Sequence, residues 1–246
     1  MKVLDLFSGI GGFSLGLERA GMETVAFCEF EPHAQEVLRK HWPKVPIHSD
    51  VRELNGHDFR GTVDVVTGGF PCQDLSVAGK QAGFNGERSS LYREMLRIIS
   101  ECRPRYAIFE NVTGLLTGES GRWFGQFLYD LAEIGFDAEW HCMEAAYIGA
   151  PHRRDRVWVI AYPDCRRHER GGKKQVQRFA NLSCELKRSI KKVGIMSYPT
   201  KPSFRGADDG VPTRLDRKRI ARLGNAVVPQ IPEAIGRAIM EVEAVA

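Results

Sequence analysis

Short apolar runs alternate with amphipathic stretches from residue 2 to residue 162. The runs have the length of buried strands, and the stretches between them repeat apolar residues at helical spacing. This alternation predicts an α/β fold with a doubly wound, mostly parallel sheet covered by helices. The predicted strands are Lys2–Leu6, Thr24–Cys28, Val63–Thr67, Tyr106–Phe109 and Val157–Ala161. The predicted helices are Phe13–Ala20, Pro32–Lys40, Leu91–Glu101 and Trp123–Ile134.

The regular pattern breaks at Pro163, and the stretch up to residue 213 is rich in Arg, Lys, Gly and Ser. A regular apolar pattern resumes after this stretch and predicts a helix over Pro232–Val242. We therefore predict one domain built from residues 1–162 and 214–246, with a small module, residues 163–213, inserted in it.

The positive charge of the chain is concentrated in one region. Residues 164–194 hold ten Lys or Arg and three Asp or Glu, whereas the whole chain has a net charge of only +4. Such a local excess favours a polyanionic partner such as nucleic acid, because neutralised phosphates release counterions. A solvated basic loop would have the same composition.

Length and cysteine usage exclude several classes of protein. A chain of 246 residues can bury one large core and a small appended module. The six cysteines form no CxxC pair, and Cys165, His168 and Cys184 lack a fourth ligand, so we predict reduced thiols and no metal site. No apolar run is long enough to cross a bilayer, and no secretion signal opens the chain, so a cytoplasmic protein is expected. A monomer is also expected.

A glycine-rich turn, within Asp5 to Gly12, lies between the first predicted strand and the first predicted helix. Glycines let the backbone approach a nucleotide-like ligand closely. The dinucleotide fingerprint requires a glycine where Ser14 stands, which disfavours a nicotinamide cofactor. Glu29, about 20 residues further on, has the spacing of an acid that accepts both ribose hydroxyls.

Three further residues fit an adenosyl ligand. Phe30 offers a face for adenine, and Asp50 with Val51 could read the exocyclic amine of the base. Each carboxylate alone could be an ordinary loop residue, but their joint spacing favours a cofactor with an adenosyl group.

A cysteine follows the third predicted strand, in the segment Phe70-Pro71-Cys72-Gln73. Loops at the carboxyl ends of strands are where doubly wound sheets bind ligands. A lone loop cysteine is usually a small apolar residue, so its neighbours must decide whether it is a nucleophile.

The motifs, taken in order, resemble the DNA (cytosine-5) methyltransferases of bacteria and phages. The resemblance covers residues 1–162 and 214–240. Its five motifs are the turn from Asp5 to Gly12, Phe70 to Gln73, Glu110-Asn111-Val112, Arg153 to Val157, and Gly224 to Pro229.

The resemblance implies a function: methyl transfer from S-adenosylmethionine to carbon 5 of a cytosine that is rotated out of double-stranded DNA. Cys72 would add to carbon 6 of the ring as a thiolate. Glu110 would act in its protonated form at ring nitrogen 3, because burial raises the pKa of a carboxyl. Arg154 and Arg156 match the arginines of the family, and Arg156 would hold the thiolate and cytosine oxygen 2.

The resemblance also implies a set of cofactor contacts and a partner. Leu91 and Val227 among them could equally be core residues. Residues 74–90 would close over the cytosine, and a restriction endonuclease could accompany the enzyme. The implied cofactor contacts are Phe7, Gly9, Gly11, Glu29, Phe30, Asp50, Val51, Pro71, Leu91, Asn225 and Val227.

Two other functions stay open at this point. RNA cytosine methyltransferases share the fold, although the form of the Phe70–Gln73 segment favours the DNA enzymes. A DNA-binding protein without catalysis is disfavoured because Cys72, Glu110 and Arg156 are all retained. The short region 163–213 predicts a recognition site of a few base pairs, or relaxed selection.

Overall fold

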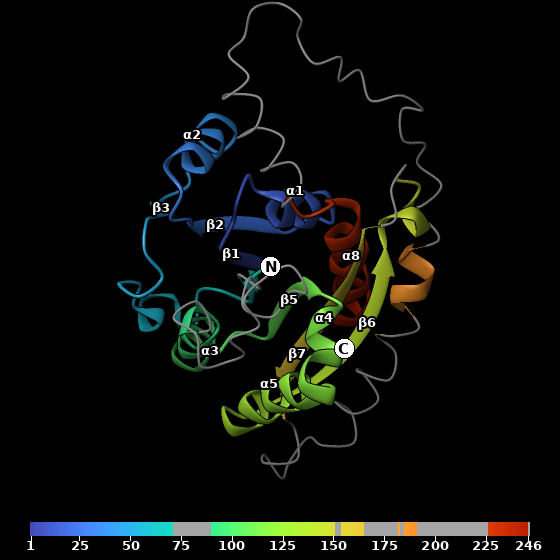
Figure 1. Cartoon of the computed structure of the whole chain (residues 1–246). Coiled ribbons are helices and arrows are strands. Elements are labelled where there is room, and N and C mark those ends of the chain that lie inside the picture. Colours follow the sequence, from blue (N-terminus) through green and yellow to red (C-terminus); the bar gives the residue numbers. More distant parts are fainter. Residues whose placement is uncertain (71–89, 151–153, 165–181, 183–184, 191–225, 246) are drawn as a thin grey trace, which may run out of the picture.

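The computed structural model describes residues 1–70, 90–150, 154–164, 182, 185–190 and 226–245. Within them, one seven-stranded sheet has the strand order β3-β2-β1-β4-β5-β7-β6 (Figure 1). Strand β7 runs antiparallel to both of its neighbours, and the other pairs are parallel. The strands are β1 (Lys2–Leu6), β2 (Glu23–Cys28), β3 (Ile47–His48), β4 (Val65–Gly68), β5 (Tyr106–Val112), β6 (Phe136–Glu144) and β7 (Asp155–Pro163).

Helices cover both faces of this sheet, as a doubly wound fold requires. Helices α3 and α5 pack on one face, and α1 and α8 pack on the other (Figure 1). Successive side chains of a strand point to opposite faces, so each strand contributes to both cores. Leu4 and Leu6 of β1 pack on the side of α3 and α5, and Val3 packs on the side of α1 and α8. The helices are α1 (Gly12–Arg19), α2 (Pro32–His41), α3 (Ser90–Cys102), α4 (Gly114–Thr117), α5 (Arg122–Glu133) and α8 (Gln230–Ala244).

Strands β1 and β4 lie side by side at the point where the strand order reverses. Leu6 and Gly68, the last residues of these strands, are register partners, so both following segments leave from the same place on the sheet edge. A crevice outside the carboxyl ends of the strands at such a reversal is where ligands bind in doubly wound sheets.

Helices α1 and α8 approach each other at backbone distance. A Cβ at Gly16 would lie 2.2 Å from the carbonyl oxygen of Pro229, and one at Gly12 would lie 2.6 Å from that of Val227. On α8, a Cβ at Gly236 would lie 2.8 Å from the Cβ of Ala20. Small residues on both helices therefore bring the C-terminal segment next to the glycine-rich turn.

The five predicted strands and the predicted helices are present, with ends that differ by a few residues. The predicted strands do not include β3, which has only two residues, or β6, although its apolar and polar residues alternate as in a half-buried strand. Leu182 and Leu186, inside the region predicted to be a separate module, pack in the same core as α1 and α8. Among the described residues, no helix is long and apolar enough for a membrane span, and no cluster could hold a metal ion.

Candidate active site

The glycine-rich turn after β1 has a backbone conformation that few side chains tolerate. Phe7, Gly9 and Gly11 have φ angles of 51°, 55° and 85°, all in the left-handed region. A Cβ at Gly9 would have no heavy atom within 4 Å, whereas one at Gly11 would lie 2.6 Å from the Trp42 ring. The turn is therefore open at Gly9 and packed against Trp42 at Gly11.

The Glu29 carboxylate, directly after β2, is held against this turn by two backbone amides. Its Oε2 accepts a hydrogen bond from the Gly9 amide at 2.7 Å, and its Oε1 accepts one from the Glu31 amide at 2.8 Å. Each oxygen has further acceptor capacity for another donor. Phe30, the next residue, is 73% exposed and leaves an aromatic surface open to solvent.

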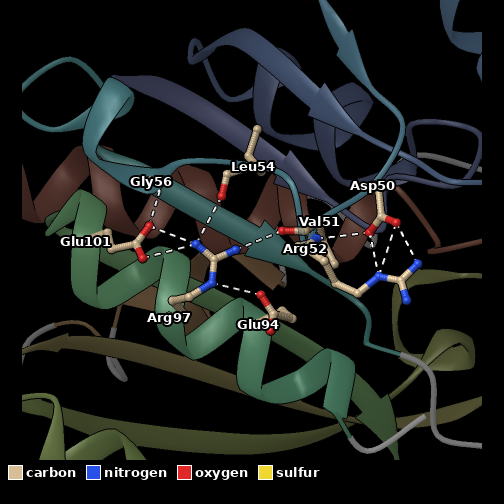
Figure 2. Close-up of polar contacts among 8 residues, drawn as sticks. All are labelled: Asp50, Val51, Arg52, Leu54, Gly56, Glu94, Arg97 and Glu101. Carbon is tan, nitrogen blue, oxygen red and sulfur yellow. Dashed lines mark hydrogen bonds and ion pairs between the residues drawn. The ribbon is translucent and has the colours of Figure 1, made fainter. Parts of the chain in front are cut away.

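Asp50 and Val51 follow β3 on the next segment (Figure 2). The Asp50 carboxylate accepts hydrogen bonds from Nε and Nη2 of Arg52, at 2.9 and 2.6 Å. These bonds hold the pKa of Asp50 below its usual range. The Val51 side chain is buried in the core on the α3 side of the sheet. Asp50 is thus ionised, and its orientation is set by Arg52.

Glu110 lies inside β5, two residues before the end of the strand, and its side chain is 11% exposed. Its Oε1 is 3.0 Å from Nε of Arg156 and 4.0 Å from Nη2 of Arg154. Burial raises the pKa of Glu110, although Arg156 and Arg154 oppose the shift. A Cβ at Gly69, directly after β4, would lie 3.3 Å from the Oε2 of Glu110. The acid therefore sits between two guanidinium groups and the start of the segment that carries Cys72.

Phe70 fixes the start of that segment. Its side chain is 4% exposed and packs against the rings of Tyr92, Phe109 and Phe127, with centroids 5.7 to 6.5 Å apart. The Asn111 amide of β5 donates to the Phe70 carbonyl oxygen at 3.4 Å. Two residues before Cys72, the chain is thus anchored by both an aromatic cluster and β5.

The remaining predicted residues are more scattered. Val227 packs beside the glycine-rich turn, against Gly12 of α1. Leu91, in the first turn of α3, is half-buried against the core. Pro71, Cys72 and Asn225 lie outside the described residues.

The sequence pattern missed a buried carboxyl beneath the turn. Asp5 of β1 is fully buried and accepts hydrogen bonds from the hydroxyls of Ser14 at 2.7 Å and Thr67 at 2.9 Å. Burial raises its pKa to about 7, and these two hydrogen bonds oppose the shift. Ser14, which stands where a dinucleotide fingerprint has glycine, thus links α1 to β1. The signal was an acid between the apolar residues Leu4 and Leu6 of this strand.

The known family of C-5 cytosine-specific DNA methylases matches residues 1–202. The chain belongs to this family. The family match includes the turn after β1, Glu110, Arg154 and Arg156, which the structure places along one edge of the sheet.

Type II methyltransferases of bacteria are similar to this chain. M.Eco47II of Escherichia coli is 38% identical over 161 residues, which are 65% of this chain and 39% of that protein. M2.BsuMI of Bacillus subtilis is 39% identical over 165 residues, 65% of this chain and 42% of that protein. A solved structure assigned as a prophage-encoded DNA modification methyltransferase of E. coli is 29% identical, with a TM-score of 0.56, over 66% of this chain and 47% of the other. The chain thus spans less than half the length of these relatives.

The family membership and the mostly parallel sheet confirm the resemblance and the fold predicted from the sequence. Five of the predicted site residues form two groups, and the members of each group contact one another. The first is the turn at Gly9 with Glu29, and the second is Glu110 with Arg154 and Arg156. Asp50 belongs to neither group: it lies on the segment after β3, where Arg52 holds its carboxylate.

Proposed function

We propose that this chain transfers a methyl group from S-adenosylmethionine to carbon 5 of cytosine in double-stranded DNA, with Cys72 as a transient covalent nucleophile. The observation that carries the proposal is the buried Glu110, held by Arg156 beside the start of the Cys72 segment. Burial raises the pKa of this carboxyl and so favours its protonated form, the form that can donate to a cytosine ring under attack.

The turn after β1 fits an adenosyl cofactor. The space at Gly9 admits a ligand against the backbone, the anchored Glu29 carboxylate can accept ribose hydroxyls, and exposed Phe30 can stack on adenine. When bound, S-adenosylmethionine would supply a methyl group activated by its bond to a positively charged sulfonium sulfur, with S-adenosylhomocysteine as the leaving group. The other residues proposed to hold the cofactor are Phe7, Gly11, Asp50, Val51, Pro71, Leu91, Asn225 and Val227.

The residues of the chain prepare the cytosine for this methyl group. The Cys72 thiolate forms a bond to carbon 6, and the displaced electron pair of the ring makes carbon 5 nucleophilic. Glu110 donates a proton or a hydrogen bond to ring nitrogen 3, where negative charge would otherwise collect. Arg156 holds cytosine oxygen 2 and stabilises the thiolate, and Arg154 adds positive charge to the site. Once carbon 5 carries the methyl group, its proton would pass to a solvent water, and the electron pair of that C–H bond would restore the double bond between carbons 5 and 6 as the carbon–sulfur bond breaks. Any proton given to ring nitrogen 3 would return to Glu110, and the Cys72 thiolate would be released.

The reacting ring atoms are buried in a stacked duplex, so the target cytosine must be rotated out of the helix, at a cost of a few kcal/mol. We further propose that residues 1–162 and 214–246 form the catalytic domain. Residues 163–213 would then contact DNA through their basic side chains and select a site of a few base pairs. A restriction endonuclease that cuts the unmethylated site is the proposed partner.

A DNA duplex that contains 5-fluorocytosine tests the chemistry. Fluorine blocks the last proton loss at carbon 5, so protein, cofactor and duplex should give a denaturant-resistant adduct on a gel. Cys72→Ala should give none, and an unmodified duplex should give methylated product without a lasting adduct. Absence of the adduct with folded wild-type protein would refute the mechanism, and methylation of tRNA but not of DNA would favour the RNA enzyme.

A further inference from the structure

Arg97, near the middle of α3, binds the chain segment that follows β3 (Figure 2). Its Nη2 donates to the Val51 carbonyl oxygen at 2.9 Å, and its Nη1 donates to the Leu54 carbonyl oxygen at 3.0 Å. Glu101, one turn further along α3, accepts a hydrogen bond from the Gly56 amide at 2.8 Å. Two side chains of one helix thus bind three backbone groups of one segment.

The guanidinium group of Arg97 is fixed on its helix by two carboxylates (Figure 2). Its Nε donates to Glu94 at 2.8 Å, and its Nη1 donates to Glu101 at 2.9 Å. Burial alone would raise the pKa of Glu101, but the bonds from Arg97 and the Gly56 amide outweigh it and lower that pKa. Because a guanidinium is planar and directs five N–H donors, no lysine can make the same set of bonds.

The bound segment also packs directly on the helix. A Cβ at Gly56 would lie 2.8 Å from both the Cβ of Glu101 and the carbonyl oxygen of Ile98. The side chains of Val51 and Leu54 are both 4% exposed in the core beneath. The segment therefore has little freedom to shift along α3 while Arg97 is in place.

We propose that Arg97 is a positioning residue for the cofactor, which holds Asp50 and Val51 at the correct place for adenine. The inference rests on the proposed function and deepens it. Arg97 binds the backbone at Val51, next to Asp50, whereas Glu110 and Arg156 lie on β5 and β7 and do not depend on this contact. Loss of Arg97 should therefore weaken cofactor binding and leave the chemistry on cytosine nearly intact.

Arg97→Gln on the full chain tests this, with Arg93→Gln, an exposed position of the same helix, as the matched control. Calorimetric titration with S-adenosylhomocysteine should give a Kd about tenfold higher for Arg97→Gln and unchanged for Arg93→Gln. The KM for S-adenosylmethionine should rise similarly. The kcat at saturating cofactor and the KM for DNA should stay within about twofold, which general destabilisation of the fold would not produce.

Gly56→Ala gives an independent perturbation, because it pushes the same segment off α3 and leaves Arg97 unchanged. It should also raise the Kd, and Arg97→Lys should fall between wild type and Arg97→Gln. Should Arg97→Gln fail to fold, these two variants decide the question. A wild-type Kd in the folded variants, or a loss confined to kcat, overturns the inference. Failure of the wild-type protein to bind S-adenosylhomocysteine would instead count against the proposed function.

Discussion

Replacement of Gly16 by alanine tests whether the contact between α1 and α8 depends on the absence of a side chain. The new Cβ would lie 2.2 Å from the Pro229 carbonyl oxygen and 2.9 Å from the Glu233 amide nitrogen. Carbon and carbonyl oxygen rarely approach closer than about 3.3 Å, so the start of α8 must move by about 1 Å. Both opposing atoms belong to the backbone, and no side-chain rotation can relieve the clash.

The expected magnitude is the difference between two opposing effects. Alanine is about 0.5–1 kcal/mol better than glycine within a helix. Overpacking of a fixed interface costs about 1–3 kcal/mol, and separation of the helices would also open contacts of fully buried Ile235 and Ile239. We therefore expect Gly16→Ala to lower the free energy of unfolding by about 1–2 kcal/mol.

Gly125 of α5 provides the control, because a Cβ there would meet no heavy atom within 4 Å. Gly125→Ala should raise the free energy of unfolding by about 0.5–1 kcal/mol. Urea unfolding followed by circular dichroism measures both variants against wild type. Equal stabilisation by the two substitutions would refute the close contact between the α1 and α8 backbones.

Two further predictions concern buried acids. The pKa of Asp5 is about 7 in the folded protein against 3.8 for the free side chain, so the unfolding free energy should fall as pH rises from about 4 to 7. Asp5→Asn should flatten that part of the stability–pH curve, and an unchanged slope in urea unfolding would count against a buried, protonated Asp5. Glu110→Gln should lower kcat by about 10²–10³-fold, with DNA affinity within a few-fold, because the amide keeps the shape but cannot give up a proton. Single-turnover methylation measures the rate, and DNA titration measures the affinity. An unaltered kcat would show that Glu110 takes no part in the reaction.

Local patterns predicted most of the fold but not its edges. Buried strands such as β1 and β4 are short apolar runs, so their positions could be read directly from the sequence. Strand β6 alternates apolar residues with Asp137, Glu139 and His141, a period-two pattern typical of a half-buried strand that the predicted strands did not include. The packing of Leu186 in the main core could not be read from the sequence, because its neighbours are mostly charged.

The candidate site could be predicted residue by residue, but its assembly could not. Motif resemblance indicated Glu29, Glu110 and Arg156, and each position follows from its strand. The partners that fix them come from distant segments: Gly9 for Glu29, and α3 with Arg97 for the segment after Asp50. Such contacts depend on the order of the strands in the sheet. The local periodicity of the sequence does not reveal that order.

The pair of Glu110 and Arg156 shows how strand register makes the site. Strands β5 and β7 are antiparallel, with Glu110 opposite Trp158 and Val112 opposite Arg156. Glu110 and Arg156 are therefore diagonal neighbours on one face of the sheet, at a distance that a long arginine side chain can span. A shift of one residue in this pairing would turn Arg156 to the other face, where it could not reach the acid. The buried apolar residues of β7, which fix that register, thus also determine whether the carboxyl meets its guanidinium partner.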